Sequence, residues 1–211
     1  MYLTLSRETI GTFIDAVYAI AVTILALEVP GQFSEGFSVV AFMELLVEYA
    51  LSFFILFALW VQHRRINDLN GDKVSSTVIW LNCLVLLLVC LVPHATTLIF
   101  SYGDDVTLVQ FEAILNHGAE WTISEFVDML YIALIIGAEL GLLVMVVIVS
   151  GGLGNDEAMR IHRSKLIVTI CTVVVLLLSL VLPVQNRYFL VFIPMTLLFE
   201  RHLTQLMYRQ S

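Results

Sequence analysis

Near its N-terminus the chain reads Phe13-Ile-Asp-Ala-Val-Tyr-Ala-Ile-Ala-Val-Thr-Ile-Leu-Ala-Leu-Glu-Val-Pro30, an apolar segment with an acid close to its start. A helix needs about 20 such residues to cross the ~30 Å hydrocarbon core of a bilayer. A carboxylate inside the hydrocarbon costs roughly 2.5–3.5 kcal/mol on insertion scales, so it normally faces protein or a water path. Asp15 therefore predicts a helix that lines an interior, and not a simple anchor.

The whole chain shares this apolar character. Of its 211 residues, 60% are hydrophobic and 13% are charged, whereas a soluble domain has about 45–50% apolar and about 25% charged residues. The sequence therefore predicts an all-α membrane protein, with one transmembrane domain over residues 1–211. Its six expected helices cover residues 10–29, 39–62, 78–100, 126–150, 166–184 and 187–206.

The basic residues gather beside alternate ends of these expected helices. Nine of the ten follow this pattern, namely Arg7 before the first, Arg64, Arg65 and Lys73 after the second, Arg160, Arg163 and Lys165 after the fourth, and Arg201 and Arg209 near the end. Only Arg187 falls on the other side. Because lysine and arginine favour cytoplasmic loops, this pattern predicts an even number of spans with both termini in the cytoplasm. The net charge of −8 gives no support to nucleic-acid binding, and membrane lipids are the expected surroundings.

The first expected helix carries a stripe of small, branched and hydroxyl side chains. At 100° per residue the stripe contains Thr12, Ala16, Ile20, Thr23 and Leu27, and Asp15 points roughly 80–140° away from its middle. Such a stripe suits a pore wall, where apolar rings gate by dewetting and hydroxyl groups replace part of an ion's hydration shell. An ordinary helix-packing surface is the alternative, and periodicity alone does not separate the two.

Other polar side chains at membrane depth offer partners for the acid. They are Ser52, Trp60, Gln62, His63, Trp80 and Asn82. If Asp15 reaches His63 or Asn82, its charge is satisfied without a transport role. The acid would then hold the first helix in a fixed rotation about its axis.

The fourth expected span combines a packing motif with a second acid. Gly137 and Gly141 have the small-xxx-small spacing that lets helix backbones approach closely. Glu139 lies between them, and either a functional role or burial by a neighbouring helix explains an acid there.

Several segments together resemble the transmembrane protein 175 family, the potassium channels of endosomes and lysosomes and their prokaryotic relatives. These segments are Phe13-Ile-Asp15 with the run to Pro30, Trp60-Val-Gln-His63, Trp80-Leu-Asn82 and Leu91-Val-Pro93. The resemblance implies a six-helix protomer in a prokaryotic plasma membrane, with self-association into a homotetramer and the first helix lining a central pore. The implied pore-lining and gate residues are Ala16, Ile20, Thr23, Ile24 and Leu27, and the implied polar network behind the pore helix is Asp15, Trp60, His63 and Asn82.

Two positions depart from the first-helix signature of that family, Arg-x-x-x-Phe-Ser-Asp. Ile14 replaces the serine, and Thr9 occupies the arginine position, with Arg7 two residues earlier. Part of the polar network implied by the resemblance is therefore absent from the first helix.

The function expected from these features is passive, potassium-permeable cation conduction. No cofactor, no soluble substrate and no metal beyond permeating potassium are expected. The sequence contains no HExxH motif or nucleophile elbow, so it does not favour an enzyme. Two alternatives remain open, namely a proton-coupled carrier that uses Asp15, His63 and Glu139, and a non-conducting scaffold or regulatory subunit.

Overall fold

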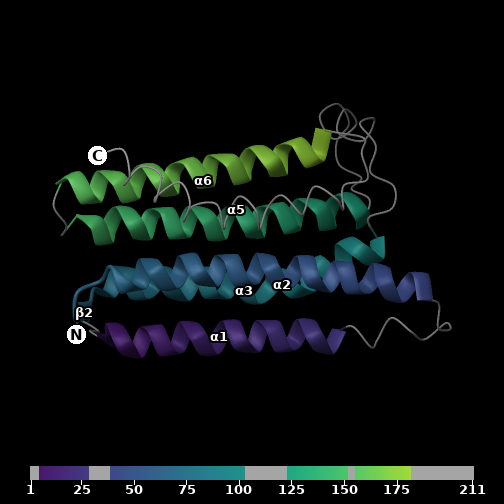
Figure 1. Cartoon of the computed structure of the whole chain (residues 1–211), viewed down its shortest axis with the longest axis horizontal. Helices are drawn as coiled ribbons and strands as arrows, with labels where there is room; N and C mark the ends of the chain where they lie inside the picture. The colour runs from purple at the N-terminus through teal and green to yellow at the C-terminus, as the bar shows by residue number, and fades with distance from the viewer. Residues whose placement is uncertain (1–4, 29–38, 103–122, 152–154, 182–211) are drawn as a thin grey trace.

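The computed structural model describes residues 5–28, 39–102, 123–151 and 155–181 (Figure 1). These residues form five helices and two short strands. The helices are α1 (Arg7–Glu28), α2 (Val39–Asp68), α3 (Ser76–Tyr102), α5 (Ile123–Ser150) and α6 (Asn155–Val181), and the strands are β1 (Leu5–Ser6) and β2 (Lys73–Val74). The span expected over residues 187–206 lies outside the described residues, and so does most of the outer loop that the sequence predicts over residues 101–125.

Three of the described helices are long and apolar enough to cross a membrane. Their spans are Arg7–Leu27 in α1, Ser76–Leu98 in α3 and Met129–Ser150 in α5. Since most of the described chain is helical and these spans have the length that a bilayer requires, the protein is an integral membrane protein.

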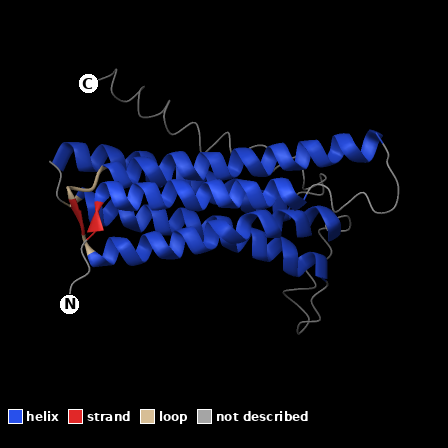
Figure 2. Cartoon of the chain, turned by 90° about the horizontal axis from the view of Figure 1, so that it is seen from below, coloured by secondary structure: helices blue, strands red, loops and turns tan. Residues whose placement is uncertain are grey.

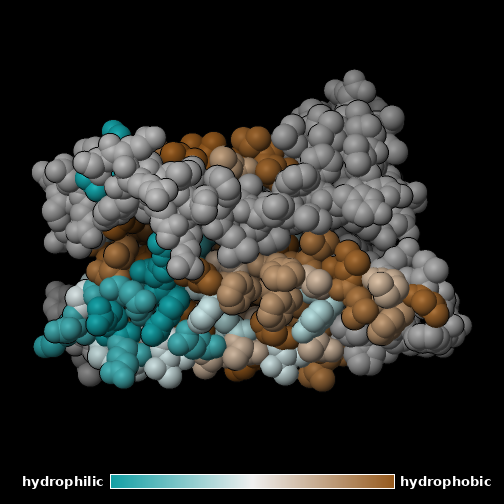
Figure 3. Space-filling model, viewed as in Figure 1, coloured by the Kyte–Doolittle hydropathy of each residue, from teal (hydrophilic) through white to brown (hydrophobic). Residues whose placement is uncertain are grey.

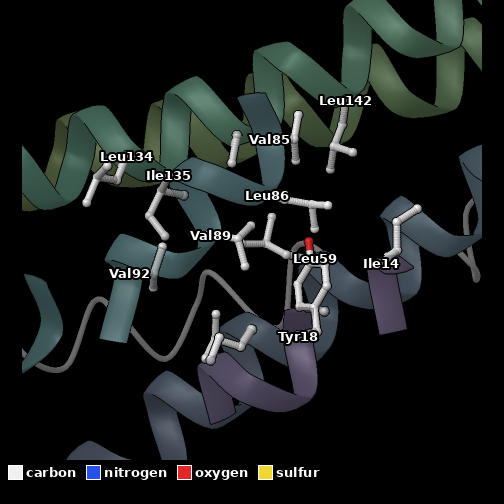
Figure 4. Packing of buried hydrophobic residues seen from close by; sticks show 14 of the residues in the cluster. Ile14, Tyr18, Leu59, Val85, Leu86, Val89, Val92, Leu134, Ile135 and Leu142 are labelled. Atoms are coloured by element: carbon white, nitrogen blue, oxygen red, sulfur yellow. The ribbon is translucent and has the colours of Figure 1, made fainter. Parts of the chain in front are cut away.

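The helices lie side by side in one bundle and alternate in direction (Figures 1 and 2). Helix α3 contacts α1, α2 and α5, and α6 packs mainly on α5. The buried core follows α3, where Val85, Leu86, Val89 and Val92 meet side chains of the neighbouring helices (Figure 4). This arrangement leaves one face of α1 uncovered by the described chain.

A small antiparallel strand pair, which the sequence did not predict, ties the start of α1 to the connection between α2 and α3. Leu5 pairs with Val74, the backbone N–H of Arg7 donates to the Asp72 carbonyl at 3.2 Å, and Asn67 Nδ2 donates to the Arg7 carbonyl at 3.2 Å. Hydrophilic residues gather at this end of the bundle (Figure 3). The first turn of α1 is therefore fixed to the hydrophilic end.

The close approach of α5 to α3 occurs where the small-xxx-small spacing predicted one. A Cβ atom placed on Gly141 would lie 2.6 Å from Val85 Cγ2, and one placed on Gly137 would lie 3.1 Å from Leu88 Cδ1. Both distances are shorter than ordinary van der Waals contact. The two glycines thus let the α5 backbone pack directly on side chains of α3.

Helix α6 begins at Asn155, well before the span that the sequence places at 166–184. The turn before it is held by a contact between Ser150 Oγ and His162 Nε2. The basic segment that includes Lys165 is consequently helical, and the Lys165 side chain is buried within the bundle instead of lying in a polar loop.

Candidate functional site

Helix α1 has two faces of opposite exposure. Its buried face consists of Ile10, Ile14, Tyr18, Ala21 and Leu25. The five residues predicted to line a pore, Ala16, Ile20, Thr23, Ile24 and Leu27, are all exposed, with Ile20 at 57% and Leu27 at 71%. Within the described part of one chain, nothing covers the predicted stripe, so this apolar face is available to lipid, to another copy of the chain or to a pore.

The hydroxyl group of Thr23 is oriented by its own helix. Thr23 Oγ1 donates to the Ala19 carbonyl at 2.8 Å, and Thr12 Oγ1 donates in the same way to the Glu8 carbonyl at 3.0 Å. A hydroxyl oxygen that has donated its hydrogen keeps two lone pairs as acceptors. The exposed face of α1 therefore offers hydroxyl oxygens that are suited to a cation.

Asp15 is anchored to α2 and not to α3. Trp60 Nε1 donates to Asp15 Oδ1 at 2.8 Å, and Arg64 Nη1 lies 3.7 Å from Asp15 Oδ2. The Asp15 side chain remains 44% exposed. Neither His63 nor Asn82, the partners considered from the sequence, contacts the Asp15 carboxylate among the described hydrogen bonds.

The arginine beside Asp15 comes from α2 and depends on a glycine of α1. A Cβ atom on Gly11 would overlap the Arg64 guanidinium, so the guanidinium would have to move if another residue replaced this glycine. Thr9 stands at the arginine position of the first-helix signature, and Arg64 supplies a guanidinium to Asp15 from the neighbouring helix. Arg7 is engaged elsewhere, because its Nη1 donates to the Asp68 carbonyl at 3.3 Å. Ile14 is fully buried and belongs to the apolar core.

His63 and Asn82 form a second, separate contact between α2 and α3. Both side chains are buried, and His63 Nε2 lies 2.7 Å from Asn82 Oδ1. Asn82 Nδ2 donates to the Val78 carbonyl at 2.7 Å, which orients the amide so that Oδ1 accepts and His63 Nε2 donates. The four residues predicted as one network therefore lie in two groups, Asp15 with Trp60 and His63 with Asn82.

A third polar group joins α5, α6 and α2, and the sequence did not predict it as a unit. Lys165 Nζ lies 2.6 Å from Glu139 Oε2, with both side chains at most 1% exposed. Lys165 also donates to Gln62 Oε1, and Thr169 Oγ1 donates to Glu139 Oε2 at 3.3 Å. The available signal was a pair of opposite charges in neighbouring apolar segments, since an intramembrane charge normally has a partner.

The structure is that of a helical integral membrane protein, with polar groups buried between its helices and an uncovered apolar stripe on its first helix. Among the described residues, no group of three His, Cys, Asp or Glu side chains is placed to hold a metal ion. Part of the chain is similar to one known family. The family model described as endosomal/lysosomal potassium channel TMEM175 matches residues 9–93, a range that contains most of α1, all of α2 and most of α3.

Two relatives agree with this match. A potassium channel of Streptomyces collinus is 29% identical over 98 residues, which are 44% of this chain and 47% of that protein. The alignment thus spans about half the length of the curated relative. The crystal structure of a lysosomal potassium-selective channel TMEM175 homolog from Chamaesiphon minutus covers 94% of this chain and 97% of that chain, with a TM-score of 0.64 and 18% identity; at this identity it shows the fold alone. The chain is thus similar to the TMEM175 family over residues 9–93, which are less than half of its length.

Proposed function

We propose that the protein is a potassium-permeable cation channel, with its pore lined by the exposed stripe of α1 from four copies of the chain. The observation that carries the proposal is the exposure of all five predicted pore residues on a helix whose opposite face is buried. The family match includes the whole of this stripe and names a potassium channel. Potassium is the permeating ion, and no resident cofactor takes part.

The stripe supplies the parts that a pore of this kind requires. Ile20 and Leu27 are seven residues apart, which is about 10 Å along a helix. Rings of these side chains around an axis would form apolar constrictions that gate by dewetting. Thr23 lies between them, with its hydroxyl hydrogen donated to Ala19, so four threonine oxygens would face an ion that has lost part of its hydration shell.

The proposed setting is the plasma membrane of a prokaryote, with both termini in the cytoplasm. The strand pair and the first turn of α1 lie at the hydrophilic end of the bundle together with Arg65 and Lys73, which are exposed. Basic residues at one end favour its retention in the cytoplasm. The proposed partners are further copies of the same chain and the surrounding lipids.

The contacts favour a channel over the proton-coupled carrier. A relay through Asp15, His63 and Glu139 needs a chain of hydrogen bonds between these groups. Asp15 contacts Trp60 and Arg64, His63 contacts Asn82, and Glu139 contacts Lys165 and Thr169. The described contacts therefore hold Asp15 apart from the other two relay candidates, so they show no continuous relay through all three groups.

Ion flux into liposomes tests the proposal. Purified protein should give fast potassium flux under a potassium gradient, and Ile20→Ala should increase conductance because it widens an apolar constriction. Leu87→Ala is the matched control, since Leu87 is 59% exposed and Ile20 is 57% exposed, but Leu87 belongs to α3. Single-channel currents of Ile20→Ala that equal wild type would remove Ile20 from the pore. Slow, saturating flux coupled to protons would favour the carrier, and the absence of flux under any gradient would favour the scaffold.

A further inference from the structure

Six buried side-chain polar atoms have no hydrogen-bond partner in the described part of the chain, and three of them lie in the core on three different helices. They are the Tyr18 hydroxyl on α1, His63 Nδ1 on α2 and Glu139 Oε1 on α5. Their side chains are at most 4% exposed. Buried polar atoms in native proteins are nearly always paired, and ordered water is one of the usual partners. Three such atoms therefore need a common explanation.

These atoms belong to one region of the core. The rings of Tyr18 and His63 meet edge to face, with their centroids 6.0 Å apart. Lys165, the partner of Glu139, also donates to Gln62, which directly precedes His63 on α2. Figure 4 shows the Tyr18 hydroxyl pointing away from α1 toward Leu59 and Leu86 in the middle of the bundle.

The donors and acceptors in this region do not balance without a further molecule. His63 donates through Nε2 to Asn82, so its Nδ1 is an acceptor. Glu139 Oε1 is also an acceptor because the carboxylate is paired with Lys165. Tyr18 is the only donor of the three, which leaves two acceptors for one hydrogen. A molecule with two hydrogens and a free lone pair satisfies all three atoms.

We propose that bound water occupies this region between α1, α2 and α5, donating to Glu139 Oε1 and His63 Nδ1 and accepting from the Tyr18 hydroxyl. Buried waters typically make about three hydrogen bonds to otherwise unsatisfied groups, and this site supplies three. The water completes the Glu139–Lys165 pair and lies on the buried side of α1, opposite the exposed stripe. The site is independent of ion conduction and of the number of chains in the assembly.

Radiolytic hydroxyl-radical labelling of the full-length protein in lipid nanodiscs tests the site. A short X-ray pulse generates radicals from bound water, so a side chain beside such water is oxidised even where bulk solvent is excluded. Tyr18 should be labelled several-fold more than Met145, which is fully buried among apolar residues. Tyr18 labelling no higher than that of Met145 would show a dry core and overturn the proposal.

Two sets of variants locate the water at this site. In the double variant Glu139→Leu with Lys165→Met, which removes both charges together, Tyr18 labelling should fall to the level of Met145. Tyr18→Phe should lower the thermal midpoint, because the lost hydroxyl leaves the water with one bond fewer. Tyr131→Phe is the matched control, since the Tyr131 hydroxyl is also buried without a described partner, but it lies eight residues before Glu139 on α5, about 12 Å along the helix. Persistent labelling in the double variant, or a midpoint for Tyr18→Phe at or above wild type, overturns the assignment.

Discussion

The ion pair between α1 and α2 and the ion pair between α5 and α6 differ in length and in exposure to solvent. In the first, Arg64 and Asp15 are 3.7 Å apart, with side chains 35% and 44% exposed. In the second, Lys165 and Glu139 are 2.6 Å apart, with side chains 1% and 0% exposed. Exposed ion pairs contribute about 0–1 kcal/mol, because solvent screens them, whereas the loss of one partner from a buried pair leaves an uncompensated charge.

The two ion pairs also differ in their position relative to the residues that match the family model. Residues 9–93 match the family model, and their ion pair can weaken without leaving a buried charge. Glu139 and Lys165 lie outside that range, but they are the more deeply buried pair. The packing of α6 on α5 therefore includes a buried ion pair that lies outside the matched residues.

Lys165→Met should have the largest effect of the variants considered. It leaves the Glu139 carboxylate buried without a cation, which we expect to lower the free energy of unfolding by about 3–5 kcal/mol. Unfolding in mixed detergent micelles measures this change. Glu139→Leu in the same chain should restore most of the loss, because replacement of a whole buried pair by apolar side chains is often neutral. A loss below about 1 kcal/mol for the single variant would contradict the deeper burial of this pair.

Gly141→Ala should have the next largest effect, because it acts where the two regions meet. The added methyl group would lie 2.6 Å from Val85 Cγ2 on α3, and overpacking of this kind typically costs about 1–3 kcal/mol. Gly137→Ala is the control, since its methyl group would meet the end of the longer Leu88 side chain at 3.1 Å. Thermal unfolding should show a clearly smaller shift for Gly137→Ala. Equal shifts would mean that the α3–α5 contact is not tighter at Gly141.

Local patterns predicted the helical class and the close packing at Gly141, whereas the pore-lining role of the stripe on α1 stays a prediction. Each depends on spacing along one helix, and the 3.6-residue period is visible in the sequence. The strand pair of β1 and β2 has two residues in each strand, which is too short to give a period. The early start of α6 was missed because its basic residues look like a loop between spans.

The polar contacts were less predictable, since they depend on how helices rotate against one another. The residues alone offered His63 and Asn82 as partners for Asp15, and the family resemblance added Trp60. In the structure the Asp15 carboxylate contacts Trp60 and Arg64, which are one turn apart on α2. Only the assembled bundle shows that Gly11 opens space for Arg64. For this reason the candidate pore residues stay a prediction that ion flux must test, whereas the contacts behind them are described directly.

Trp60→Phe should have a moderate effect on the α1–α2 contact. The change removes the N–H group that donates to Asp15 Oδ1 at 2.8 Å, and a typical hydrogen bond contributes about 1 kcal/mol. Asp15→Asn is the control, because it keeps an oxygen that accepts from Trp60, and it should cost less. Chemical unfolding of both variants measures the difference. A larger loss for Asp15→Asn would indicate that the charge, and not the hydrogen bond, holds α1 to α2.

Arg64→Gln should have the smallest effect, and its salt dependence sharpens the comparison most. The pair with Asp15 is partly exposed, so its loss should cost about 0.2–1 kcal/mol. At 1 M salt the screening length falls to about 3 Å, and the difference between Arg64→Gln and wild type should then disappear. The difference between Lys165→Met and wild type should persist at the same salt concentration, because solvent ions do not reach a buried pair. If both differences vanish in high salt, Glu139 and Lys165 are accessible to water and ions, and the contrast between the two contacts is wrong.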